Sequence, residues 1–254
     1  MTDRVSQAPD RLPVLASVWQ DARLLWRGLR GTLRRRRWLA AACTSAFLLV
    51  VGLGLHPQDA TLLRVVQLRQ TADKQVRAEL SRWAEALSDF GDFPGVLACL
   101  VALWIGGRWC KSRHYQRLAV AALMSAMLAG VVANISRSTT GRPRPRTIER
   151  EHVQDGFYGP RLRANYHSFP SAHTSTAFGA AIPLAVAAPV LGVPALAAAG
   201  SIAWARMYGN HHHPSDVAVA IWVATFYGVP LGLAVRRLRS TGAAGDGKGP
   251  LPGA

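Results

Sequence analysis

The stretch that decides the fold is residues 118–135, LAVAALMSAMLAGVVANI, which contains no charged residue and is followed by Arg137. At about 1.5 Å per helical residue, a stretch of this length crosses most of a hydrocarbon layer of roughly 30 Å. Apolar runs bounded by basic residues are typical of membrane-spanning helices, and Arg117 precedes this one directly. The sequence therefore predicts a membrane protein.

Other apolar stretches on both sides of this run predict further spans. The block 177–205 is too long for one crossing, and Pro189 and Pro194 divide it into two spans joined by a tight turn. The expected spans are residues 38–55, 93–107, 118–135, 174–188, 190–207 and 217–235. The predicted fold class is all-α, a six-transmembrane-helix bundle with amphipathic interfacial helices.

The segments outside the spans complete the predicted organisation. Residues 1–37 are basic, too long and too hydrophilic for a cleaved signal peptide, and carry apolar residues at helical spacing, which predicts a helix on the inner membrane surface. Residues 56–92 predict a second interfacial helix, outside the bilayer. The expected domain is 38–236, and residues 237–254 are expected to form a disordered cytoplasmic tail.

The net charge of +16 raises the possibility of nucleic-acid binding. Most arginines flank apolar segments, however, so we expect a membrane bilayer as the partner and no nucleic acid. Six spans with the amino terminus inside place 17 of the 30 Lys and Arg residues on the inner side. The cysteines Cys43, Cys99 and Cys110 lack metal-ligand spacing, so neither a disulfide nor zinc is expected.

A cluster of arginines between the third and fourth spans opposes this charge rule. Its members are Arg137, Arg142, Arg144, Arg146, Arg150, Arg161 and Arg163. The prolines of the run Arg137-Ser-Thr-Thr-Gly-Arg-Pro-Arg-Pro145 favour an extended backbone that splays the side chains. Guanidinium groups match phosphate oxygens in pairs, although contact with lipid headgroups would explain the run equally well.

Two further polar segments fall on the same side of the membrane. The first, residues 168–174, places Ser171 and His173 at a helix start, where backbone N–H groups face an anion, or where Ser171 simply caps the helix. The second, residues 205–216, contains Arg206 and Asp216; ionisable groups at membrane level are candidate site residues, although Asp216 could merely cap the last span.

The run of three consecutive histidines in the second segment could suggest a metal. Adjacent side chains diverge in a helix or a strand, so His211, His212 and His213 cannot easily bind one ion. We therefore predict no metal and no cofactor.

Together, the three segments resemble the signature of the type 2 phosphatidic acid phosphatase (PAP2) family: Lys-x6-Arg-Pro, then Pro-Ser-Gly-His, then Ser-Arg-x5-His-x3-Asp. Order and spacing are kept over roughly residues 90–236, with Arg137 in place of lysine, Ala172 in place of glycine and Ala205 in place of serine. The counterparts are Arg137-x6-Arg144-Pro145, Pro170-Ser171-Ala172-His173 and Ala205-Arg206-x5-His212-x3-Asp216.

The resemblance implies a metal-independent phosphatase that forms a phosphohistidine. His212 would attack phosphorus, Asp216 would orient and stabilise its ring, and His173 would protonate the leaving group. The phosphate oxygens would lie among the charged and N–H groups that stabilise phosphoryl transfer. The implied phosphate-binding residues are Arg137, Arg144, Ser171, Ala172 and Arg206.

The expected partner is a lipid phosphate at the periplasmic face of a bacterial inner membrane. The resemblance suggests polyprenyl pyrophosphate, lipid A phosphate, phosphatidylglycerol phosphate and phosphatidic acid, with residues 146–169 helping to choose among them. Transfer of phosphate to a lipid acceptor and a catalytically silent lipid-binding or transport protein are the alternatives. Soluble haloperoxidases with similar motifs are disfavoured by the six spans, and the sequence does not give the oligomeric state.

Overall fold

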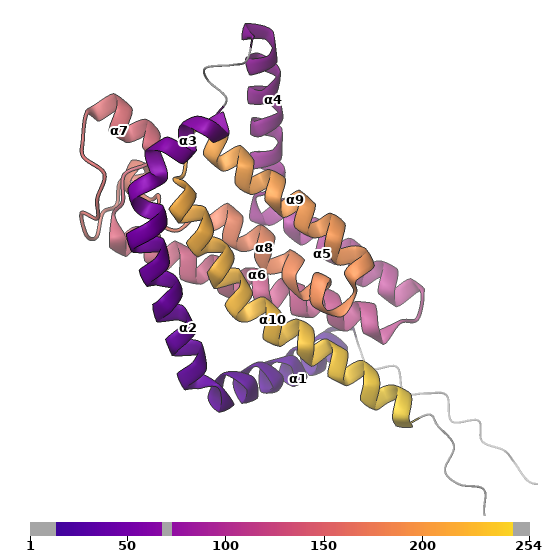
Figure 1. Ribbon diagram of the computed structural model, residues 1–254. Coiled ribbons are helices and arrows are strands. Elements are labelled where there is room, and N and C mark those ends of the chain that lie inside the picture. Colours follow the sequence, from indigo (N-terminus) through magenta and orange to yellow (C-terminus); the bar gives the residue numbers. More distant parts are fainter. Residues whose placement is uncertain (1–13, 68–72, 246–254) are drawn as a thin grey trace, which may run out of the picture.

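In the computed structural model, residues 14–67 and 73–245 are described, and within these ranges every regular element is a helix. The long helices form one bundle, with α3, α4 and α7 at one end and α1 at the opposite end (Figure 1). The elements are α1 Val14–Arg35, α2 Arg37–Val50, η1 Val51–Leu55, η2 His56–Gln58, α3 Asp59–Gln67, α4 Lys74–Phe90, α5 Phe93–Trp109, α6 Arg113–Thr140, α7 Pro145–Glu151, η3 Ala164–Tyr166, α8 Ala172–Ala187, α9 Pro189–Tyr208 and α10 Pro214–Gly245.

Helix α6 lies at the centre of the bundle and packs against α5, α8 and α10. Its buried face consists largely of alanine, which lets neighbouring backbones approach closely, as is usual for helices in membranes. The approach is tightest at Gly179 of α8, where an added Cβ would lie 2.8 Å from the Cα of Ala126. Close contact between α6 and α8 brings the ends of both helices, and the polar segments attached to them, to one place.

Helix α1 is part of the bundle core. Leu25 and Leu29 are almost completely buried against apolar residues of α6 and α10. The buried carboxylate of Asp21 accepts hydrogen bonds from Arg113 at 3.1 Å and from Arg117 at 3.2 Å. The amphipathic helix predicted in this segment is therefore present. Leu25 and Leu29 of its apolar stripe face protein, whereas Leu15 and Trp26 are exposed.

The membrane-spanning character of the bundle agrees with the predicted fold class. Four helical stretches are long and apolar enough to cross a membrane, and a fifth span results if α4 and α5, which meet at a bend of 62°, count as one. Helix α8 occupies the expected fourth span but has only 16 residues. The all-α class is confirmed, and the count of six crossings stays a prediction.

Three expected boundaries differ from the structure. The first span does not end at residue 55, because helical structure continues from Arg37 to Gln67, so only α4 matches the separate outer helix expected over 56–92. Helix α10 continues to Gly245, so residues 237–245 are helical and the expected disordered tail is wrong there; residues 246–254 lie outside the described part. Helix α6 continues to Thr140, so Arg137 sits on its last turn and not on extended backbone.

Candidate active site

The three polar segments singled out in the sequence meet at one end of the bundle. The backbone N–H of Ser168 donates to the carbonyl oxygen of Arg142 at 3.1 Å, and the N–H of Ser171 donates to that of Asp216 at 3.3 Å. The middle segment is thus hydrogen bonded to each of the others. The sequence places all three segments on one side of the membrane, and the structure brings them into contact.

His212 is held with one ring nitrogen engaged and the other open. Its side chain is buried, and Nδ1 lies 2.8 Å from the carbonyl oxygen of Ser168. A carbonyl can only accept, so Nδ1 carries the proton and Nε2 keeps its lone pair. Burial lowers the pKa of His212 to about 4, because the charged ring is poorly solvated; Asp216 opposes this shift, whereas Arg206 and Arg144 reinforce it. The ring is neutral near pH 7 and suited to nucleophilic attack through Nε2.

Asp216 supports His212 from a distance and through a shared partner. Its Oδ2 lies 3.8 Å from His212 Nδ1, beyond hydrogen-bonding distance. The same oxygen accepts from the hydroxyl of Ser168 at 2.6 Å and from the backbone N–H of His213 at 2.8 Å. The carboxylate fixes the segment whose carbonyl holds the ring and supplies a negative charge nearby. The resemblance implied that Asp216 orients the His212 ring directly. In the structure the carbonyl oxygen of Ser168 contacts the ring nitrogen instead.

Arg142 pairs with Asp216 and with two other carboxylates. Its side chain is 1% exposed, and its Nη1 donates to Asp216 Oδ1 at 2.6 Å. Its Nη2 donates to Asp59 at 2.9 Å and to Asp155 at 2.7 Å. Burial would raise the pKa of Asp155, but the hydrogen bond and charge of Arg142 outweigh this effect and lower it. Arg142, Asp59, Asp155 and Asp216 form what we call the paired cluster.

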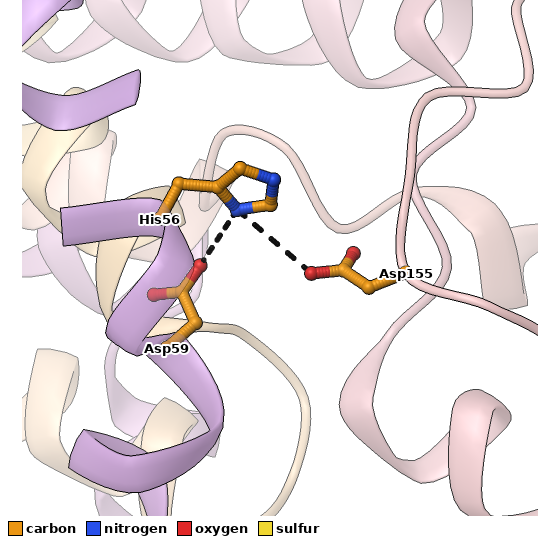
Figure 2. Close-up of side chains that lie close together, drawn as sticks. All are labelled: His56, Asp59 and Asp155. Carbon is orange, nitrogen blue, oxygen red and sulfur yellow. Dashed lines mark hydrogen bonds and ion pairs between the residues drawn. The ribbon is translucent and has the colours of Figure 1, made fainter. Parts of the chain in front are cut away.

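His56 lies beside this cluster, and together with Asp59 and Asp155 it has the composition and spacing of a metal site (Figure 2). His56 and Asp59 come from the junction of η2 and α3, and Asp155 faces them from the segment after α7. The nitrogen Nη2 of Arg142 lies 2.9 Å from His56 Nδ1, 2.9 Å from Asp59 and 2.7 Å from Asp155. A guanidinium cation therefore takes the place that a metal would need, and we assign the group to Arg142.

Two other arginines have buried donors that no described residue accepts, and a third arginine acts on the same region. The Nε atoms of Arg144 and Arg206 are buried without a hydrogen-bond partner among the described residues. Arg206 uses only Nη1, which donates to the hydroxyl of Ser88 at 3.1 Å. Arg137, on the last turn of α6, acts on the same region. Its positive charge lowers the pKa of His173, as do the charges of Arg206 and Arg144. We call Arg137, Arg144 and Arg206 the open cluster.

The middle segment begins α8. Ser171 is the N-cap residue, and its Oγ accepts from the backbone N–H of Thr174 at 3.5 Å and from the Thr174 hydroxyl at 2.9 Å. The capping alternative weighed for Ser171 is therefore realised. Ala172 is not among the described residues with positive φ, so alanine in place of glycine causes no backbone strain there. The N–H groups of this first helical turn remain oriented for an anion.

His173 has an unexpected acidic partner. Its Nε2 lies 2.5 Å from Oδ1 of Asp92, the residue immediately before α5. No signal in the sequence linked Asp92 to the site, because it stands at the start of an apolar span where an N-cap function would explain it.

The adjacent histidines diverge, as the sequence predicted. His213 Nε2 faces the carbonyl oxygen of Pro143 at 3.3 Å, whereas His212 faces Ser168. His211 instead lines a cavity of about 300 Å³ between α4 and α9, beside Ser88 and Arg206. These three rings have different neighbours and do not converge on one point.

A comparison with family models identifies this arrangement. The model described as PAP2 superfamily matches residues 118–239, which contain all three segments. Residues 118–239 belong to the PAP2 superfamily. For these residues the resemblance to the PAP2 family is confirmed, and with it the class of PAP2-type phosphoric ester hydrolase. No curated protein sequence matches the chain.

Two solved structures are similar to this chain at low sequence identity. The crystal structure of Aquifex aeolicus LpxE has a TM-score of 0.49 and 19% identity, covering 70% of this chain and 94% of that one. The first transmembrane PAP2 type phosphatidylglycerolphosphate phosphatase from Bacillus subtilis has a TM-score of 0.47 and 15% identity, covering 82% of this chain and 98% of that one.

The outer stretch 146–169 of the PAP2 domain was expected to influence substrate choice. In the structure its arginines stack on its tyrosines: Arg161 lies 5.4 Å from the ring centre of Tyr158 and 5.0 Å from that of Tyr166. Arg163 lies 5.6 Å from Tyr166 and donates to Glu151 at 3.0 Å. These contacts shape the outer loop, and its influence on the substrate stays a prediction.

Proposed function

We propose that this chain is a membrane lipid phosphatase that hydrolyses a phosphomonoester or pyrophosphate on a lipid headgroup through a phosphohistidine. The observation that carries the proposal is the open cluster. Burying guanidinium N–H groups without acceptors is costly, so such donors are expected to face an anion when the protein works. A tetrahedral phosphate offers acceptors to several guanidinium groups at once.

The reaction follows from the two ring environments. Nε2 of His212 attacks phosphorus while the bond to the leaving oxygen breaks and His173 gives that oxygen a proton. Water then hydrolyses the phosphohistidine, with His173 taking a proton from it. Arg137, Arg144, Arg206, Ser171 and the backbone N–H groups of Ala172 and His173 stabilise the charge on the phosphate oxygens during both steps.

The membrane supplies the context for the substrate. Phosphate bound at the end of the bundle leaves the lipid tails in the bilayer. The distribution of Lys and Arg favours this end on the outer side, which is the periplasm if the protein lies in a bacterial inner membrane, as we propose. A tag on the carboxyl terminus that is accessible only from the cytoplasm would agree with this orientation. Periplasmic access would reverse it.

The decisive experiment is a phosphate-release panel on the purified protein in lipid nanodiscs, with chelator present. Polyprenyl pyrophosphate, lipid A phosphate, phosphatidylglycerol phosphate and phosphatidic acid are the substrates to compare. We expect release from at least one, together with an acid-labile, alkali-stable phosphoenzyme that His212→Ala eliminates. The control is His152→Asn, since His152 is exposed and Asn tolerates its positive φ of 50°.

Each other outcome has a defined meaning. A lipid product extended by phosphate, with little free phosphate, would replace hydrolysis by transfer. Absence of release from all four lipids would favour a silent lipid-binding or transport protein. Normal turnover by a folded His212→Ala protein would overturn the assignment of the nucleophile.

A further inference from the structure

The contact between Asp92 and His173 joins two elements that the reaction itself does not require to meet. Asp92 precedes α5 at the 62° bend after α4, and His173 is the second residue of α8. Oδ1 of Asp92 lies 2.5 Å from Nε2 of His173, and the aspartate side chain is 58% exposed. A carboxylate at the solvent side therefore contacts the proposed general acid directly.

Asp92 makes this contact in place of the role that its position favours. An aspartate at an N-cap usually accepts a hydrogen bond from a backbone N–H of the first helical turn. Asp92 is the N-cap of α5, yet its side chain makes no capping hydrogen bond. The carboxylate is directed to the histidine instead, so helix capping does not explain this residue.

The surroundings of His173 explain why a carboxylate is needed. Burial and the charges of Arg206, Arg137 and Arg144 lower the pKa of His173, and Asp92 is the carboxylate that opposes this shift. A carboxylate oxygen and an imidazole nitrogen 2.5 Å apart would repel each other without a hydrogen between them, so this separation places a proton at Nε2. A general acid must carry its proton before the leaving group departs. The elements around α8 contribute Arg137 from α6, Arg144 from the segment before α7, Arg206 from α9, Asp216 from α10, and His211 and His212 from the loop between α9 and α10. Of these, Asp216 has its charge taken up by Arg142.

We infer that Asp92 is a positioning residue that keeps a proton on His173 for transfer to the leaving oxygen; this inference rests on the proposed function. The carboxylate of Asp92, 2.5 Å from Nε2, stabilises the imidazolium, and the proton on Nδ1 is the one that the leaving oxygen can take. In the reaction the P–N bond to His212 forms, the P–O bond breaks, and the leaving oxygen takes one proton from His173. The imidazolium becomes neutral imidazole, and the water that attacks the phosphohistidine restores its proton.

A leaving-group comparison separates this role from a structural one. An alkoxide leaves poorly without a proton, whereas p-nitrophenolate leaves readily as an anion. Asp92→Asn should therefore lower kcat for the lipid phosphate by about 10- to 100-fold, within the range of general-acid effects, and leave kcat for p-nitrophenyl phosphate nearly unchanged. The alkaline limb of the lipid reaction should move to lower pH, because His173 loses its proton more easily.

The matched control is Asp89→Asn, which removes an exposed negative charge near Arg206 but has no hydrogen bond to His173 in the described structure. It should leave both reactions and the pH profile unchanged, and Asp92→Glu should restore part of the lost rate. An equal loss for the two substrates in Asp92→Asn, or no loss for either, would overturn the inference.

A titration independent of turnover distinguishes this inference from the proposed function. NMR of histidine-labelled protein in detergent should show a lower pKa for His173 in Asp92→Asn than in the wild type or Asp89→Asn. An unchanged pKa would refute the inference even in an active enzyme. A lowered pKa in a protein that releases no phosphate would instead refute the proposed function and leave the coupling of Asp92 to His173 intact.

Discussion

Arg142 and Arg144 are separated by one proline and lie in opposite chemical surroundings. Arg142 is surrounded by the carboxylates of Asp59, Asp155 and Asp216 and by the hydroxyl of Ser215, at 2.6–3.0 Å. Arg144 keeps a buried Nε without an acceptor among the described residues. The paired cluster holds the segments together, and the open cluster is the group that we propose binds an anion. A buried arginine thus indicates a ligand only when the protein leaves its donors unused.

The strongest way to break this contrast is to remove the paired arginine. Arg142→Ala leaves Asp59 and Asp216 buried without their cation, which should cost about 3–5 kcal/mol and abolish activity as well. Thermal unfolding in detergent and phosphate release measure the two effects. Arg150→Ala, which removes an exposed charge from α7, should change neither. An unchanged unfolding temperature in Arg142→Ala would show that the paired cluster has no structural role.

The second prediction concerns the open arginine. Arg144→Ala should lower kcat/KM by about 100- to 1,000-fold, the usual cost of losing one preorganised donor to a transition-state oxyanion. Its unfolding temperature should not fall, because the guanidinium satisfies no carboxylate in the described structure. Kinetics and unfolding of the same preparation test both statements. Loss of stability comparable to that of Arg142→Ala would remove the distinction between the clusters.

The smallest expected effect is a change in pH dependence, which sharpens the comparison at His212. Protonation of Nε2 removes the nucleophile, and burial lowers the pKa of His212 to about 4, so kcat/KM should fall only as the pH drops through about 4. The measurement uses p-nitrophenyl phosphate, corrected for its own ionisation, so that protonation by His173 does not limit the rate. Arg144→Gln removes a charge that helps to lower this pKa, so its acid limb should move to higher pH. A wild-type limb near pH 6.5 would contradict the assignment.

Much of the bundle could be predicted because each span is marked in the sequence by its own apolar run and by the basic residues beside it. The helices α5, α6, α8, α9 and α10 overlap the expected spans, and the three motif segments meet as their common side required. The ends of helices were less predictable. No local signal stops α6 at residue 135 or the first span at residue 55, so the sequence predicts extended backbone at Arg137, which lies on the last turn of α6, and a first span that ends too early.

The partners of the site residues could not be predicted, because they come from remote segments. Asp59 reaches Arg142 from the far end of the first span, and Asp92 reaches His173 from the start of α5. Spacing alone also could not assign the arginines to the paired and the open cluster. Arg142 and Arg144 differ only in which remote side chains the fold brings beside them. The motif identified Arg144, His173 and His212, and the three-dimensional structure was needed to show what holds each of them.

The carbonyl of Ser168 sets the tautomer of His212, and this has a consequence for how the protein can change over time. A main-chain oxygen is present whatever residue occupies position 168, so no single codon change deletes the acceptor. Substitutions at position 168 would remove the hydroxyl that donates to Asp216. They would leave the carbonyl oxygen that fixes the orientation of the His212 ring. Chemical variation can therefore accumulate around this histidine while its reactive nitrogen stays the same.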